Sequence, residues 1–193
     1  PVLPGICGEG DARRNFGTWQ GEEANCFAAV LTAINCKNIA IIGEGTVDGN
    51  ALSSDWYQNH RVMRIAWRPR GLFFNRCNGV LVQGITVRDT PSWNVHPYFC
   101  KNVKLYNLGL YNAPSMPTTD GIDPDCCENV DIAGVNISVG DDCIAIKSGT
   151  LELARRYKTP CKNITVTDCL MESGHGGVVF GSESSGGIEN VLV

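Results

Sequence analysis

Apolar and polar residues alternate in short runs along most of the chain. Clear cases are residues 80–87, Val-Leu-Val-Gln-Gly-Ile-Thr-Val, and residues 164–170, Ile-Thr-Val-Thr-Asp-Cys-Leu. A period of two, in segments rich in Val, Ile and Thr, is typical of β-strands, and the glycines and asparagines between the runs are typical of turns. Helical periodicity is almost absent, so the pattern predicts an all-β fold built from short strands.

A four-residue phrase recurs ahead of these alternating runs. It reads Cys-Lys-Asn-Ile at 36–39, and related phrases begin at 77, 100, 127, 161 and 188. The intervals are 23 to 34 residues, except that 41 residues separate the first two phrases, which indicates an extra excursion there. A sandwich or a propeller would need tight hairpin turns, but the only Asn-Gly dipeptide, at 78–79, lies inside a phrase. Short strands at this spacing indicate a solenoid with coils stacked about 4.8 Å apart, and we expect a right-handed parallel β-helix.

Cysteine opens five of these phrases. Residues at one phase of a solenoid point in one direction, so we expect Cys36, Cys77, Cys100, Cys127 and Cys161 to form an inward stack of small, free thiols rather than disulfides. A disulfide between Cys7 and Cys26, outside the repeat, stays open as an alternative. No Cys-x-x-Cys pair is present, so the cysteines do not indicate a metal site.

Length and charge exclude several classes of protein. The 193 residues carry 16 basic and 20 acidic side chains, a net charge of -4, which argues against nucleic-acid binding through phosphate contacts. No run approaches the roughly 20 apolar residues of a membrane-spanning helix. The last residues, 188–193, stop within an alternating run. We therefore expect one partial β-helix domain over 1–193, truncated at both ends, with about six to seven coils and further C-terminal coils missing, so that the isolated piece is inactive or poorly soluble.

The repeat also predicts which polar side chains lie together. Asp141 and His175 each stand twelve residues after the asparagine of their phrase, and each follows a glycine. If the loop at 114–119 is left out, Asp120 takes the same place one coil earlier. Consecutive residues of a regular strand face opposite ways, so Asp142 joins its neighbour only if the backbone bends there. We expect a groove lined by Trp93, Asn94, His96, Asp120, Asp141, Asp142 and His175.

Carboxyl groups that share so small a space repel one another when ionised. This repulsion raises the pKa of at least one of them, which then keeps its proton. A protonated carboxylic acid beside an ionised carboxylate is the pair used in glycoside hydrolysis, where one group protonates the leaving oxygen and the other activates water.

The segments that carry these residues resemble the signature segments of the polygalacturonase family, glycoside hydrolase family 28. They are 119–124, Thr-Asp-Gly-Ile-Asp-Pro; 140–149, Gly-Asp-Asp-Cys-Ile-Ala-Ile-Lys-Ser-Gly; and 174–177, Gly-His-Gly-Gly. Residues 45–49 and 74–97 resemble bacterial members of the family. The resemblance implies a right-handed parallel β-helix that hydrolyses α-1,4-linked galacturonate in pectin with inversion, without a metal or other cofactor.

The same resemblance implies roles for individual residues. Asp141 would be the general acid, Asp120 and Asp142 would hold and activate the water, and His175 would tune or orient the acid. The family's Asn-Thr-Asp reads Thr118-Thr119-Asp120 here, and its substrate-gripping Arg-x-Lys segment would lie beyond Val193.

We expect the substrate to be an acidic polysaccharide or oligogalacturonide, bound by Trp93, Asn94, His96 and Lys147, with residues 155–158 as a further source of positive charge. Trp93 also fits a role as an anchor in the core, and His96 fits a packing role equally well.

Two other functions remain open: polysaccharide binding without turnover, and calcium-dependent pectate lysis. We expect a monomer that is extracellular or in the cell envelope, as the resemblance implies, although many free thiols would also suit the cytoplasm.

Overall fold

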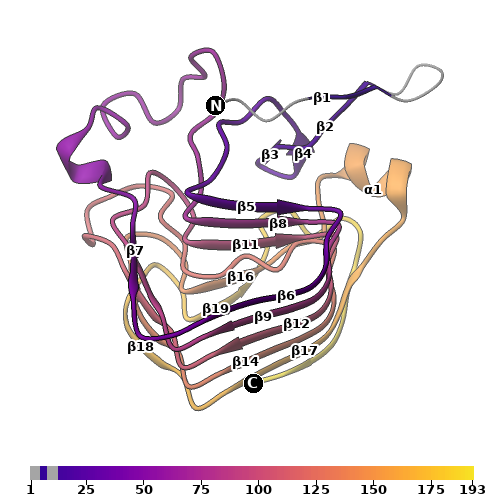
Figure 1. Cartoon of the computed structure of the whole chain (residues 1–193). Coiled ribbons are helices and arrows are strands. Elements are labelled where there is room, and N and C mark those ends of the chain that lie inside the picture. The colour runs from indigo at the N-terminus through magenta and orange to yellow at the C-terminus, as the bar shows by residue number, and fades with distance from the viewer. Residues whose placement is uncertain (1–4, 8–12) are drawn as a thin grey trace.

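The chain winds into a stack of coils whose walls are parallel sheets, as Figure 1 shows. This computed structural model describes residues 5–7 and 13–193, with side chains from residue 16 onward. The six-stranded sheet contains β6 (Lys37–Ile42), β9 (Asn78–Gln83), β12 (Lys101–Tyr106), β14 (Glu128–Ala133), β17 (Cys161–Thr167) and β20 (Ile188–Leu192). The five-stranded sheet contains β7 (Thr46–Asp48), β10 (Thr86–Arg88), β13 (Gly109–Tyr111), β15 (Asn136–Ser138) and β18 (Leu170–Ser173). The predicted right-handed parallel β-helix is confirmed.

A third wall carries the segments that hold the predicted site. It consists of β5 (Leu31–Ile34), β8 (Leu72–Asn75) and β11 (Val95–Tyr98), and it continues through isolated bridges at residues 122 and 125 to β16 (Ile144–Ile146) and β19 (Val178–Phe180). Strands in this wall run side by side in the same direction. Residues that precede each strand by the same number of positions therefore meet at one edge of the wall.

The asparagines of the recurring phrase stabilise the turn that leads into the six-stranded sheet. Their φ angles are positive, for example 56° at Asn102, 59° at Asn129 and 57° at Asn163, and Gly79 has this conformation at the same place. Asparagine tolerates this left-handed conformation better than most residues. From Asn102 onward, each side-chain amide also donates a hydrogen bond to an asparagine oxygen of the preceding coil, at 3.0 Å from Asn129 to Asn102 and 2.9 Å from Asn163 to Asn129. The phrase therefore marks a turn with its own ladder of side-chain bonds.

Four of the five phrase cysteines point inward, as predicted, and the prediction is wrong for Cys36. Cys77, Cys100, Cys127 and Cys161 are buried free thiols in the main apolar core, while Cys36, in the first coil of the stack, is a free but exposed thiol. Burial raises the pKa of the Cys161 thiol to about 12, so this side chain behaves as a small apolar group. Cys26 is also a free thiol. The Cys7 side chain lies outside the described residues.

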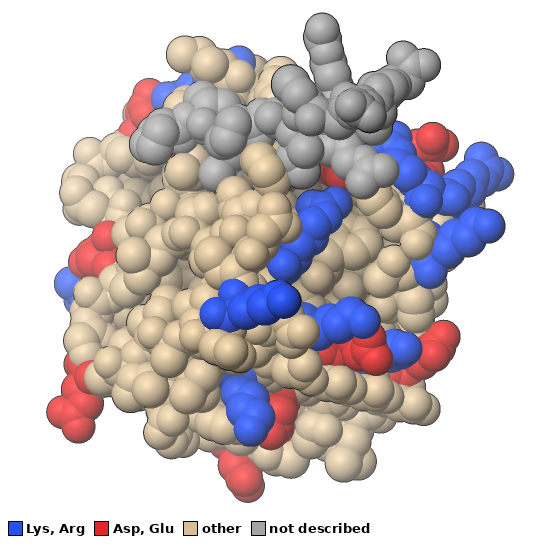
Figure 2. All heavy atoms as spheres, turned by 45° about the vertical axis from the view of Figure 1, so that its right-hand side comes forward, with Lys and Arg blue, Asp and Glu red and all other residues tan. Residues whose placement is uncertain are grey.

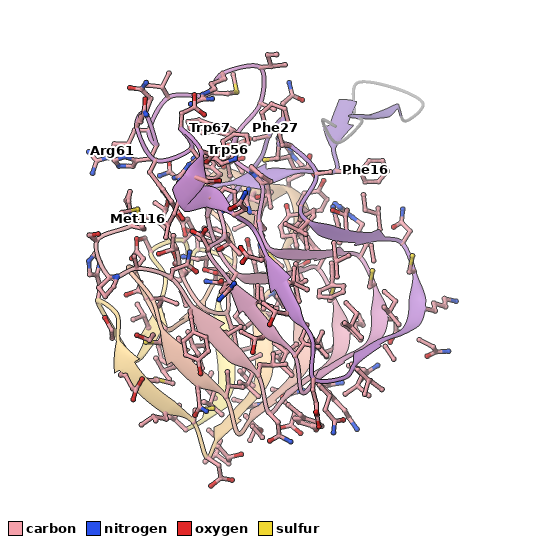
Figure 3. All side chains as sticks on the ribbon, turned by 60° about the vertical axis from the view of Figure 1, so that its left-hand side comes forward. Phe16, Phe27, Trp56, Arg61, Trp67 and Met116 are labelled. Carbon is pink, nitrogen blue, oxygen red and sulfur yellow. The ribbon has the colours of Figure 1, made fainter. Side chains whose placement is uncertain are left out.

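A separate set of segments, called the cover below, lies at the side of the open edge of β5 (Figure 1). It comprises β1 (Gly5–Cys7), β2 (Arg13–Asn15), the hairpin of β3 (Thr18–Trp19) and β4 (Glu22–Glu23), and the excursion, residues 49–71, which contains the short 3-10 helix η1 (Ala51–Ser53). The excursion fills the long interval of the repeat, as expected. Figure 3 shows the side chains of Phe27, Trp56 and Trp67 gathered above the coils.

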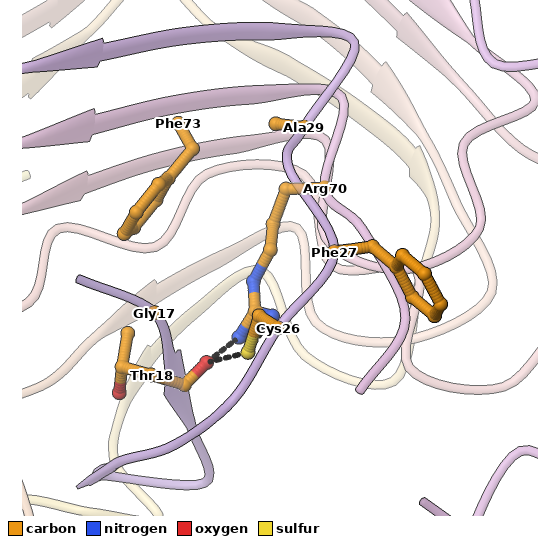
Figure 4. A pocket seen from close by; sticks show the side chains of 7 residues that line it. All are labelled: Gly17, Thr18, Cys26, Phe27, Ala29, Arg70 and Phe73. Atoms are coloured by element: carbon orange, nitrogen blue, oxygen red, sulfur yellow. Dashed lines mark hydrogen bonds between the residues drawn. The ribbon is translucent and has the colours of Figure 1, made fainter. Parts of the chain in front are cut away.

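Buried arginines connect this cover to the coils. The Trp19 and Trp67 rings stack with centroids 4.7 Å apart, and the Arg70 guanidinium lies 4.9 Å from the Trp19 ring and 4.8 Å from the Trp93 ring. Arg70 also donates a 2.5 Å hydrogen bond to the Thr18 carbonyl oxygen, which the Cys26 thiol approaches at 3.3 Å (Figure 4). Cation–π contacts and charge-assisted hydrogen bonds to one buried guanidinium thus fix the hairpin against the third wall.

The asparagine ladder leads to a test of stability. We expect Asn129→Ala to lower the free energy of unfolding by about 1–3 kcal/mol, because it removes two side-chain hydrogen bonds and places a Cβ-bearing residue without polar compensation in the left-handed region. Asn129→Gly should cost less, because glycine adopts this conformation freely. Urea denaturation of both variants measures the difference. Equal losses in the two variants would show that the backbone conformation contributes nothing.

Candidate active site

Three carboxylates meet at the edge of the third wall where the chain enters it. One oxygen from each of Asp120, Asp141 and Asp142 lies within 4.8 Å of the others. Asp120 precedes the bridge at residue 122, and the other two precede β16. The structure therefore brings together the carboxylates that the repeat places one coil apart.

The backbone bends at residues 140 and 141, as the sequence required. Gly140 allows this bend, because a Cβ there would stand 2.2 Å from the Met116 carbonyl oxygen. Asp141 then accepts hydrogen bonds from two backbone N–H groups, at 3.1 Å from Thr118 and 3.0 Å from Asp142. Since the first of these donors belongs to the loop at 113–119, the loop that interrupts the repeat also helps to hold the Asp141 carboxylate.

His175 completes the group. Its Nδ1 lies 3.3 Å from Asp141 Oδ1, and its backbone N–H donates a 3.0 Å hydrogen bond to the Asp141 carbonyl oxygen. The imidazole side chain is 73% exposed, whereas the Asp141 side chain is 25% exposed. This imidazole can therefore exchange protons with solvent while it contacts the carboxylate.

The three carboxyl groups differ in burial and therefore in proton affinity. Asp120 is only 4% exposed, and burial, helped by the negative charge of Asp141 and opposed by Lys147, raises its pKa to about 7. Burial and the charge of Asp141 also raise the pKa of Asp142. The site thus holds one buried carboxyl group with a pKa of about 7, that of Asp120, beside two partly exposed aspartates.

Further acids lie behind the site. Asp123 and Asp125 are fully buried, and burial raises the pKa of Asp123 well above its usual value and that of Asp125 to about 6. Lys147 Nζ lies 3.7 Å from Asp123, 3.2 Å from Glu183 and 2.9 Å from the Gly181 carbonyl oxygen. Burial lowers the pKa of Lys147, but the surrounding carboxylates outweigh that effect and raise it. Lys147 therefore stays charged as the counterion of buried acids.

The residues expected to bind substrate lie beneath the carboxylates. Trp93, Asn94, His96 and Lys147 are all buried, so they do not form the surface of a groove as the sequence analysis expected. The reason is packing within and between coils, since Asn94 contacts Thr90 and Thr119 and Lys147 contacts Asp123 and Glu183, while Arg70 of the excursion covers the Trp93 ring. Asn94 donates a 2.9 Å hydrogen bond to the Asp120 carbonyl oxygen and so supports the catalytic candidate from behind.

His96 is buried as completely as Asn94. Burial lowers its pKa well below its usual value, so the ring is neutral, and it packs edge-on against Trp93 with centroids 4.7 Å apart. Of the two readings that the sequence left open for His96, packing is the one that this position favours.

The open space beside the carboxylates is a cleft of about 470 Å³. Its lining combines Asp141 and His175 with residues from the cover and from the loop at 113–119, which are Trp19, Gln20, His60, Arg61, Trp67, Pro117 and Thr118. Sequence reasoning missed these seven residues. The 41-residue interval and the tryptophans were the available signals, but neither shows where an excursion folds back.

The basic segment at 155–158 has a different position from the one expected. Residues 151–157 form the only α-helix of the described chain, α1 (Leu151–Tyr157), at the far end of β5 and β8 from the excursion (Figure 1). Arg156 lies 3.3 Å from Glu23, and Arg76 lies at the same distance from the other oxygen of that carboxylate. Figure 2, in which the right-hand side of Figure 1 comes forward, shows several Lys and Arg side chains on this face. None of residues 155–158 lines the cleft.

The burial of Asp120 predicts how stability depends on pH. Between the ordinary aspartate pKa near 3.9 and a folded-state pKa of about 7, the folded chain binds more protons than the unfolded chain. Its free energy of unfolding should therefore fall as pH rises through this range, by at most about 1.4 kcal/mol per pH unit for one such group. Urea denaturation between pH 4 and pH 8 should show a shallower fall in Asp120→Asn than in the wild type. The same slope in both proteins would contradict the assignment of a raised pKa to Asp120.

Comparison with known proteins adds independent information. The chain is 31% identical to a probable polygalacturonase of Vitis vinifera, in a match that covers 92% of this chain and 36% of the relative. It is 33% identical to a probable polygalacturonase of Arabidopsis thaliana, in a match that covers 92% of this chain and 35% of the relative. A solved exopolygalacturonase from Thermotoga maritima superimposes with a TM-score of 0.83 at 30% identity, covering 91% of this chain and 48% of that one.

A polygalacturonase from Erwinia carotovora superimposes with a TM-score of 0.75 at 25% identity, covering 89% of this chain and 46% of that one. The chain spans about a third of the length of the curated relatives named above. In the described part of the chain, no helix is long and apolar enough to span a bilayer. The family model for glycosyl hydrolases family 28 matches residues 9–193. The chain therefore belongs to glycosyl hydrolase family 28.

Proposed function

We propose that this chain carries the catalytic centre of a polygalacturonase, an enzyme that hydrolyses the α-1,4-glycosidic bonds between galacturonate residues of pectin. The observation that carries the proposal is the group of three carboxylates with oxygens within 4.8 Å of one another, beside an open cleft. Family membership supports the same reaction, since the similar proteins bear the names polygalacturonase and exopolygalacturonase.

The geometry supports a division of roles. Asp141 lines the cleft and contacts the exposed imidazole of His175, so it is placed to protonate the leaving oxygen and to be reprotonated from solvent. Asp120 and Asp142 lie behind it, where they can hold a water between them. Because Asp120 has a pKa of about 7, it acts as a base only after losing its proton, and the nearby Lys147 charge favours that loss.

Removal of the proposed acid tests the function directly. Asp141→Asn should lower the release of reducing ends from polygalacturonate by about 10²- to 10⁴-fold, because general acid catalysis contributes that much. Asp168→Asn is the matched control: residue 168 is exposed, has a φ of 53° that asparagine tolerates, and does not line the cleft. Unchanged release in Asp141→Asn would exclude the acid assignment. No release by the wild type would favour a protein that binds polysaccharide without turnover.

The stereochemistry needs its own measurement. Inverting enzymes usually hold their two carboxyl groups roughly 6.5–9.5 Å apart and retaining enzymes about 5–5.5 Å apart. The closest oxygens here lie within 4.8 Å, so separation alone favours retention, whereas family resemblance implies inversion. We expect inversion, with the water bound directly by Asp120 and Asp142. Proton NMR of the first turnovers should show the β-anomer at the new reducing end, and an initial α-anomer would establish retention.

The lyase alternative makes a different demand. A calcium-dependent lyase would use the clustered aspartates as metal ligands and would release unsaturated products that absorb ultraviolet light. We expect activity to survive a chelator, with no unsaturated product.

We further propose that the enzyme acts on its polymer outside the cell or in the cell envelope, as a monomer. The many cysteines do not oppose export, because the thiols of the central stack are buried and burial raises the pKa of Cys127 and of Cys161. Such thiols are poor nucleophiles and resist oxidation.

A further inference from the structure

The cleft presents a problem of charge. Its substrate under the proposed function is a polyanion, yet the site contains three aspartates and the whole chain has a net charge of -4. A cleft that binds an anionic ligand must concentrate positive charge locally. Lys147 does not meet this need, because it is buried among Asp123, Glu183 and a carbonyl oxygen.

Among the cleft-lining residues that the structure describes, Arg61 is the only one with a permanent positive charge. It lies in the excursion, and its side chain is exposed. Among the residues whose side chains the structure describes, no carboxylate pairs with Arg61. By contrast, Arg64 of the same excursion lies 2.9 Å from Asp55 and over the Trp56 ring. Figure 3 shows Arg61 at the same side of the molecule as Met116, the residue before Pro117, which also lines the cleft.

The position of Arg61 relative to the carboxylates is fixed by a buried guanidinium. Arg68 donates a 3.2 Å hydrogen bond to the carbonyl oxygen of His60, the residue before Arg61, and another to the Thr118 hydroxyl. The Thr118 backbone N–H in turn donates to Asp141. A short series of hydrogen bonds therefore connects the backbone beside Arg61 with the proposed general acid.

We propose that Arg61 binds the carboxylate of a galacturonate residue in the cleft and so makes the site select an acidic sugar over a neutral or esterified one. This inference rests on the proposed function and assigns a substrate-binding residue to it. The guanidinium offers two parallel N–H donors to one carboxylate, which a methyl ester or a neutral sugar cannot match. Trp67, held by its stack on Trp19, forms a rigid wall of the same cleft.

The test compares two arginines of one excursion. Arg61→Gln should raise KM for polygalacturonate by about 10- to 100-fold and change kcat by less than about threefold, because the contact forms on binding and lies away from the reacting atoms. Arg61→Lys should recover part of the loss. Arg64→Gln removes the same charge from an exposed ion pair and should leave KM unchanged, since such pairs contribute little. An Arg61→Gln enzyme with the KM of the wild type would overturn the proposal.

A binding measurement separates this inference from the proposed reaction. In an Asp141→Asn background, titration calorimetry with trigalacturonate should give a Kd about 10- to 100-fold weaker when Arg61→Gln is added. With the methyl-esterified trisaccharide, the same addition should change Kd by less than about threefold. If Arg61→Gln weakens binding of both ligands equally, Arg61 does not recognise the carboxylate, and the proposal is overturned. If the wild type binds trigalacturonate through Arg61 but hydrolyses nothing, the proposed function fails while this inference stands.

Discussion

Parallel stacking of the coils is the constraint on which the whole site depends. Each strand pairs in register with the strand one coil away, for example Val103 with both Val80 and Val130. A strand with one buried face cannot shift its register without exposing its apolar side chains. Residues at the same number of positions from the phrase in successive coils therefore lie next to one another on the surface. Asp120 and Asp141 are 21 positions apart, yet this register, together with the bend at residues 140 and 141, brings their carboxylates together.

Holding acids together in this way opposes stability. Asp120, Asp123 and Asp125 are buried with raised pKa values, and Lys147 is the single ammonium within 4 Å of any of them in the described chain. An ionised carboxylate without full hydrogen bonding is costly in the interior. The surrounding core of buried aliphatic residues and thiols, each large side chain contributing roughly 1.5–3 kcal/mol, makes such an arrangement tolerable. The same molecule thus combines a repetitive apolar core with a cluster of buried acids that opposes stability.

The sequence predicts what the repeat controls and little else. The fold, the inward cysteines, the bend after Gly140 and the meeting of the three aspartates all follow from counting along the phrases. Burial of Asn94 and His96 could not be predicted this way, because it depends on neighbouring side chains, such as Thr90 beside Asn94 and Phe73 beside His96, whose packing the repeat does not specify. The short helix α1 was missed for a related reason: seven residues are too few for a clear helical period. The role of the phrase asparagines also needed the backbone angles, since a turn residue and a side-chain ladder look alike in the sequence.

The excursion between β7 and β8 joins two strands whose pairing it leaves intact, since Thr46 still lies opposite Thr86 and Leu31 opposite Leu72. The β-ladders therefore do not constrain most of its length, although Arg68 within it hydrogen-bonds to the Thr118 hydroxyl, beside the Asp141 carboxylate. Of its residues, His60, Arg61 and Trp67 line the cleft, so changes in this one corner alter the surface that a ligand meets while the ladder that brings the carboxylates together stays in place. Exchange of exposed residues in such a corner is therefore a practical route to change what the cleft binds without redesigning the acidic group beside it.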